Sequence, residues 1–178
     1  AVSQRTIFGV EGGPRRAYDG AFLFLGAGTQ LGPLQAKGFA YLLDYDLKEQ
    51  TGPLALANAD TQTYGLRVTG AFPVAPATKL NVAASYARQT DWKENPADFS
   101  AEYVAAEAGL ALGRFNATAG YEKLGGNGSR SFQTPMATLH KFNGWADLFL
   151  GTPPAGLQDF YGGASYSFKQ VKALPGLN

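Results

Sequence analysis

The segment KGFAYLLDYD, residues 37–46, alternates between two kinds of side chain with a period of two. One side is large and apolar and holds Phe39, Tyr41, Leu43 and Tyr45. The other side is small or charged and holds Ala36, Gly38, Ala40, Asp44 and Asp46. Because successive side chains of a β-strand point to opposite faces, this pattern predicts a strand with one large apolar face.

The same alternation recurs along the rest of the chain. It is found in TYGLRVTGAF (63–72), LNVAASYARQ (80–89), YVAAEAGLAL (103–112), FNATAGYE (115–122) and FYGGASYSF (160–168). Two earlier strands, near Arg5 to Glu11 and Tyr18 to Thr29, are less regular because AFLFLGAG is apolar on both sides. The sequence therefore predicts about eight strands of roughly 8 to 12 residues, longer than is usual in soluble proteins.

Short and long connections alternate between these strands. Short turns are expected at Leu31–Leu34, Phe72–Lys79 and Gly113–Arg114. Longer polar loops are expected at Glu11–Tyr18, Leu47–Thr61, Thr90–Phe99 and Gly125–Asp159. Tight periplasmic turns and long extracellular loops are typical of outer-membrane barrels. We therefore expect an all-β fold, an antiparallel transmembrane β-barrel or barrel segment that occupies residues 1–178 as one domain.

Composition excludes several classes of function. The chain has no cysteine and one histidine, so disulfides, thiolate catalysis and cysteine- or histidine-rich metal sites are excluded, and we expect no cofactor. Fifteen basic against fourteen acidic residues leave a net charge of +1, which disfavours a nucleic-acid partner. The sequence contains no run of about 18 apolar residues, so no membrane-spanning helix is predicted. A membrane-spanning strand needs only about 9 to 11 residues and is not excluded by this test.

The two strand faces suggest which side meets lipid. Charged residues make up only 16% of the chain, fewer than the surface of a soluble protein normally carries. A membrane barrel turns its large apolar side chains outward and encloses a polar lumen. Aromatic residues near strand ends agree with interfacial girdles, although strands are also generally rich in aromatic residues. The alternative is a soluble, lipocalin-like barrel with the large residues inside.

Three stretches resemble the alginate-export family of outer-membrane porins. They are AGYEKLGGNGSRSFQTPMATLHKFNGWADLFLGTPPAGLQDFYGGASYSF (119–168), ARQTDWKENPADFSAEYVAAEAGL (87–110) and GFAYLLDYD (38–46). The resemblance implies an outer-membrane barrel whose members are considerably longer than this chain. The chain would then be a C-terminal portion of the barrel that lacks the last strands.

The expected function is a porin-like channel and not an enzyme. It would pass small hydrophilic solutes or an anionic polysaccharide, and membrane lipid and other envelope proteins are its expected neighbours. Family members are thought to pass alginate through a cationic lumen, but here only Arg67 is clearly placed to face it. The predicted pore-lining residues are Asp44, Arg67, Tyr103, Glu107, Glu122 and Tyr161. The alternative is a non-conducting barrel that serves as an anchor or as a subunit of an envelope complex.

The long loop contains a possible short helix. Apolar residues recur at helical spacing between Met136 and Leu150, after Thr134–Pro135 and before Gly151. Such a helix would either narrow the pore or cap the barrel by burying its apolar side. The residues concerned are His140, Phe142, Trp145 and Phe149. We interpret His140 as a solvated loop histidine, because no nucleophile or paired carboxylate lies at a catalytic spacing.

Overall fold

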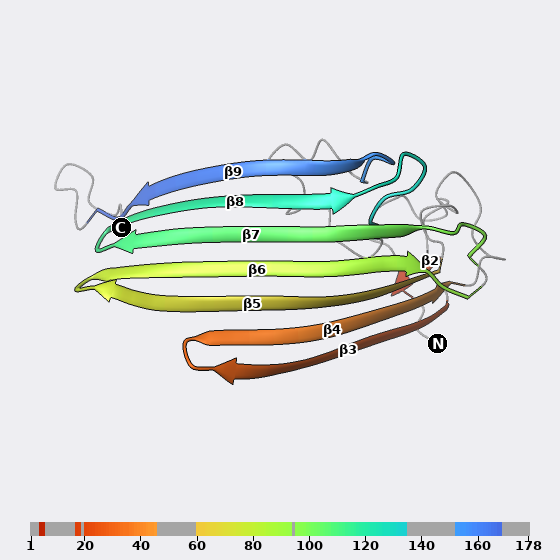
Figure 1. The fold of residues 1–178 in the computed structure, drawn as a ribbon, viewed down its shortest axis with the longest axis horizontal. Helices are drawn as coiled ribbons and strands as arrows, with labels where there is room; N and C mark the ends of the chain where they lie inside the picture. The colour runs from red at the N-terminus through yellow and green to blue at the C-terminus, as the bar shows by residue number, and fades with distance from the viewer. Residues whose placement is uncertain are drawn as a thin grey trace.

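A computed structural model describes residues 4–5, 17–18, 20–45, 60–93, 95–134 and 152–168. Seven strands form one antiparallel sheet in the order of the chain (Figure 1). They are β3 (Gly20–Leu31), β4 (Leu34–Tyr45), β5 (Thr61–Ala75), β6 (Thr78–Asp91), β7 (Ser100–Leu112), β8 (Phe115–Gly125) and β9 (Gly156–Tyr166). Two short strands, β1 (Gln4–Arg5) and β2 (Ala17–Tyr18), pair separately. No helix in the described ranges is long and apolar enough to span a membrane.

The prediction of an all-β antiparallel fold is confirmed. The strands of the main sheet are 11 to 15 residues long: β3, β4, β8 and β9 lie within the predicted range, and β5, β6 and β7 exceed it. There are seven of them where about eight were expected, and of the first predicted strand, near Arg5 to Glu11, only Arg5 lies in a described strand, β1. Among the described strands, β3 and β9 each pair on one side only, so the sheet does not close on itself.

The predicted alternation of connections is also present. Two-residue turns join β3 to β4, β5 to β6 and β7 to β8, all at one end of the sheet (Figure 1). Gly32 and Gly113 have φ angles of 61° and 60°, which glycine adopts without a steric penalty at the first position of such a turn. The predicted Phe72–Lys79 turn is shorter, because β5 continues through a register shift between Pro73 and Ala75. The loop predicted to end at Asp159 ends earlier, because β9 already begins at Gly156.

The register divides the side chains between two faces, because residues directly opposite one another in an antiparallel pair lie on the same face. We call one of them the apolar face, and it carries Leu23, Leu25, Leu66, Val68, Leu80, Val82, Val104, Leu110, Ala119 and Phe160. We call the other the polar face, and it carries Thr63, Arg67, Ser85, Gln89, Glu107, Thr118, Glu122 and Ser165. Five strands, β5 to β9, follow the predicted division.

The β4 strand reverses the predicted division. Tyr41 pairs with Thr63 and Phe39 with Gly65, so the large side chains of β4 lie on the polar face. Asp44 consequently lies on the opposite face of the sheet from Arg67, so the prediction that both share the small or charged face is wrong. The physical reason is register, which sequence alternation within one strand does not reveal.

Burial differs sharply between the two faces. On the apolar face Leu66 is 49% exposed, Tyr64 52% and Phe160 78%. On the polar face Thr63 and Gln89 are buried, because the segments around Phe99 and Phe132 lie over this face at the loop end. A small apolar cluster forms there from Ala87, Phe99, Ala101, Leu124 and Phe132, and Phe39 and Tyr103 pack against it. At its loop end the polar face is therefore buried, whereas the apolar face leaves large apolar side chains exposed.

Candidate functional site

One rung of the sheet carries charges at both of its ends. Successive register pairs connect one residue from each of six neighbouring strands across the polar face, and we call this set the charged rung: Lys37, Arg67, Ser85, Ala105, Glu122 and Asp159. Both cations come from β4 and β5, and both carboxylates from β8 and β9. Neighbouring strands lie about 4.8 Å apart, so the cationic and anionic halves are separated by roughly 14 Å.

Like charges face each other directly at each end of the charged rung. Lys37 is the register partner of Arg67, and Glu122 is the register partner of Asp159. Directly opposed like charges destabilise a sheet, and a pairing of opposite charges would have been more stable. Residues that lower stability in this way are expected where function requires them. The charged rung is therefore the best candidate for a functional site on the polar face.

Hydrogen bonds hold the charged side chains of this face in place. The Arg67 Nη1 atom donates to Ser85 Oγ at 3.0 Å. The Tyr103 hydroxyl donates to Glu122 Oε1 at 2.7 Å, and the Tyr161 hydroxyl donates to Glu107 Oε2 at 2.8 Å. Hydrogen bonds to a carboxylate are shorter and stronger than those between neutral groups. Both carboxylates are therefore fixed in direction by a neighbouring tyrosine.

Two glycines make room for aromatic rings on the polar face. A Cβ atom added at Gly65 would meet the ring of Phe39 at 2.2 Å, and one added at Gly120 would meet the ring of Tyr161 at 2.2 Å. The two rings therefore lie flat over the backbone of the neighbouring strand. For Tyr161 this orientation directs the hydroxyl toward Glu107.

The long loop after β8 is attached to the polar face through Gln89. The Gln89 amide donates from Nε2 to the Gln133 carbonyl at 3.0 Å and accepts at Oε1 from the Gln133 backbone N–H at 2.7 Å. Gln89 Nε2 also donates to Thr63 Oγ1 at 3.0 Å. The Phe132 N–H donates to the Gly125 carbonyl, which holds the start of the loop close to the end of β8. The loop therefore begins its course over the polar face.

Five of the six predicted pore-lining residues share the polar face. They are Arg67, Tyr103, Glu107, Glu122 and Tyr161. Asp44 is instead on the apolar face at the loop end, where it forms an ion pair with Lys93. The predicted loop helix and its residues His140, Phe142, Trp145 and Phe149 lie outside the described residues.

Sequence reasoning missed two of the four charged members of the charged rung. Lys37 was missed because the faces of β4 were reversed, and Asp159 because it was placed in the preceding loop. The sequence does contain a signal for the face on which Lys37 lies. The ring of Phe39, which shares a face with Lys37, needs a glycine opposite it, and Gly65 is on the same side of β5 as Arg67. In the described part of the chain, no three histidine or acidic side chains lie close enough together to hold a metal ion.

Comparisons with protein-family models, with curated proteins and with solved structures find no match to this chain.

Proposed function

We propose that the chain forms part of the wall of a bacterial outer-membrane β-barrel, through which small hydrophilic solutes or an anionic polysaccharide pass. One observation carries the proposal: the sheet buries Thr63 and Gln89 on one face while Leu66 and Phe160 on the other remain exposed. A water-soluble protein avoids large exposed apolar patches. In a membrane barrel, the apolar face contacts lipid and the polar face encloses water.

Strand length supports the same proposal. The β3 and β4 strands each have 12 residues. At about 3.3 Å per residue such a strand reaches about 40 Å, and at a tilt of about 45° it crosses about 28 Å, close to the apolar band of an outer-membrane barrel. The resemblance to alginate-export porins belongs to this proposal, with β3 and β9 as the edges that further strands would complete.

The transport itself requires no catalytic group. Passage through a lumen depends on its diameter and on the charges of its wall. The charged rung supplies both signs of charge from fixed positions, and the hydroxyl groups of Tyr103 and Tyr161 are bound to Glu122 and Glu107. We therefore place the selectivity of the proposed channel in the charged rung.

A non-conducting anchor is the second candidate, and a specific observation favours it. Phe99, Leu124 and Phe132 fill part of the polar face at the loop end and exclude water from it. If this cluster extends across the lumen, the barrel is a membrane anchor or a subunit of an envelope complex. A soluble, lipocalin-like barrel has less support, because its large apolar side chains would have to be buried.

The first experiment tests which face meets lipid. The chain has no native cysteine, so single cysteines can be introduced at Ala105 and Ala106, neighbours near the middle of β7 that lie on the polar and the apolar face. Each substitution adds only a sulfur atom. In vesicles, Ala105→Cys should react with a charged, membrane-impermeant thiol reagent, and Ala106→Cys should react only after the membrane is dissolved. Equal labelling of both in intact vesicles would refute the membrane assignment.

The second experiment separates a channel from an anchor. Protein reconstituted in a planar bilayer should produce a persistent ion current. Absence of current from protein that shows the expected labelling pattern would exclude the channel and favour the anchor.

A further inference from the structure

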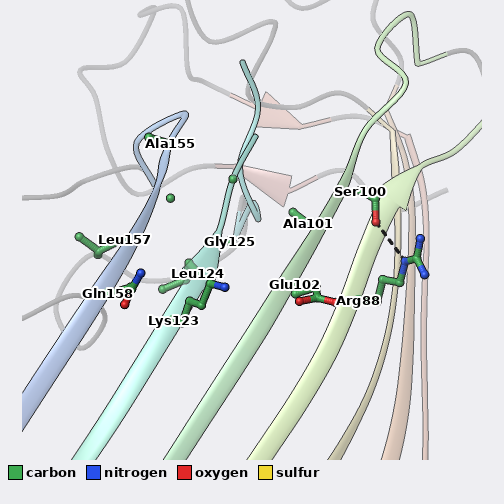
Figure 2. A pocket seen from close by; sticks show the side chains of 12 residues that line it. Arg88, Ser100, Ala101, Glu102, Lys123, Leu124, Gly125, Ala155, Leu157 and Gln158 are labelled. Atoms are coloured by element: carbon green, nitrogen blue, oxygen red, sulfur yellow. Dashed lines mark hydrogen bonds between the residues drawn. The ribbon is translucent and has the colours of Figure 1, made fainter. Parts of the chain in front are cut away.

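A pocket lies at the loop end of strands β6 to β9, and its polar side chains are on the opposite face from the charged rung (Figure 2). Its volume is about 630 Å³. Five polar side chains line it, and the register assigns all of them to the apolar face: Arg88, Ser100, Glu102, Lys123 and Gln158. Gly125, Gly126 and Gly156 also line it, at the ends of β8 and β9, where the backbones approach too closely for a Cβ atom.

The pocket is placed at the boundary between polar and apolar surface. Immediately toward the turn end, the apolar face presents Val104, Tyr121 and Phe160, and the rings of Tyr121 and Phe160 pack 4.6 Å apart. Two tyrosines cross this boundary with their hydroxyls directed at pocket residues. Tyr86 donates to Glu102 at 3.1 Å, and Tyr121 donates to Gln158 at 3.2 Å. This is the orientation of amphipathic rings at a membrane interface.

The charges of the pocket favour an anion that carries further polar groups. Arg88 and Lys123 supply two positive charges and Glu102 one negative charge, which leaves an excess of one positive charge. Arg88 Nε donates to Ser100 Oγ at 3.0 Å, a bond that orients the guanidinium and leaves its terminal nitrogens for a ligand. Lys123 has no hydrogen-bond or ion-pair partner within the described ranges. Glu102 and Gln158 can accept from a hydroxyl or an ammonium group.

We propose that this pocket binds the phosphate-bearing headgroup of a membrane lipid. The phosphate would contact Arg88 and Lys123, and the acyl chains would lie along Val104, Tyr121 and Phe160. Arginine and lysine are the usual protein partners of phosphate, and a lipid phosphate lies at the depth where the apolar surface ends. The inference rests on the proposed membrane location, because only then does the apolar face meet lipid.

The test uses the full chain in a neutral detergent and native mass spectrometry. The probes are phosphatidic acid, diacylglycerol with the same acyl chains, and inorganic phosphate. Phosphatidic acid should bind more tightly than the other two. Lys123→Gln and Arg88→Gln should each weaken its binding by about tenfold or more, as expected for loss of a charge-assisted hydrogen bond. Lys79→Gln, on the polar face near the turn end, is the matched control and should bind as the original chain does.

Three results would overturn the proposal. Diacylglycerol that binds as tightly as phosphatidic acid would exclude recognition of the headgroup, and phosphate that binds as tightly would indicate an anion site without lipid specificity. Lys123→Gln that behaves as Lys79→Gln does would exclude the pocket, and this variant is informative even if Arg88→Gln fails to fold. Thiol labelling at Ala105 and Ala106 distinguishes the two levels of failure. Labelling as expected with any of these three results refutes the lipid site alone, whereas equal labelling refutes the membrane location itself.

Discussion

An arginine at Val68 tests directly whether the apolar face is in contact with hydrocarbon. Val68 is the eighth of the 15 residues of β5, so it lies at the middle of the strand. Its register partners on the two neighbouring strands are Ala36 and Ala84, whose small side chains leave space for a longer one. Val68→Arg therefore introduces a charge with little steric conflict. Its cost reports mainly on the medium that the face contacts.

The expected cost follows from the position of Val68. An arginine on the lipid face at the bilayer midplane destabilises a barrel by about 2 to 4 kcal/mol, which lowers the ratio of folded to unfolded protein by roughly thirtyfold to several hundredfold. Thr69→Arg is the matched control, because Thr69 is the next residue and lies on the polar face. Its effect should stay within about 1 kcal/mol, as is usual for substitutions that face water.

The assay is a urea titration of the protein folded in lipid vesicles, followed by the band shift between heated and unheated samples in gel electrophoresis. The free energies of unfolding of Val68→Arg, Thr69→Arg and the original chain are compared. A cost for Val68→Arg no larger than that for Thr69→Arg would show that both faces contact water. The assignment of the apolar face to lipid would then have to be abandoned.

Three further predictions concern the polar face. Under a salt gradient, Arg67→Glu should shift the reversal potential toward cation selectivity, and Glu107→Gln should shift it toward anion selectivity. Equal reversal potentials in both variants would contradict a position of Arg67 and Glu107 in the lumen. Gln89→Ala should lower the free energy of unfolding by about 1 to 3 kcal/mol, because it leaves buried partners without hydrogen bonds, and should speed amide exchange at residues 131–133. The substitution of the exposed Gln35 by alanine is the control. No difference between the two variants would contradict the attachment of the loop. Phe132→Ala should lower the free energy of unfolding by about 3 to 5 kcal/mol in the same urea titration, because it opens a cavity in the apolar cluster. A negligible decrease would mean that the loop does not pack there.

The sequence predicts the strands of this protein well because the alternation is local. From β5 to β9, each strand shows one side of Leu, Val, Ala and aromatic residues and one side of small or polar residues, and the register matches these sides across the sheet. Strand ends are predicted less well. The β5 strand continues past Phe72 with Pro73 paired to Lys79, and Val74 is the extra residue at the register shift that follows.

The faces of β4 were not predictable from alternation alone. A strand with large side chains on one side fits either face of its neighbour, and a shift of register by one residue exchanges the two. Here the ring of Phe39 occupies the space over Gly65, and the buried Leu43 and Tyr45 lie at the loop end of the polar face. The choice was therefore made by long-range packing, which a pattern within residues 37–46 does not contain.

The arrangement of charge on the polar face bears on the choice between the two proposed solutes. The net charge of +1 suggests a nearly neutral wall, yet the charged rung separates Lys37 and Arg67 from Glu122 and Asp159. An extended polyanion that fills the lumen would approach the carboxylates as closely as the cations, and repulsion at one side would offset attraction at the other. A small solute with both a positive and a negative end can align with the separated charges and is attracted at both ends. In the proposed channel, the charged rung would therefore favour small dipolar or zwitterionic solutes over a uniform polyanion such as alginate.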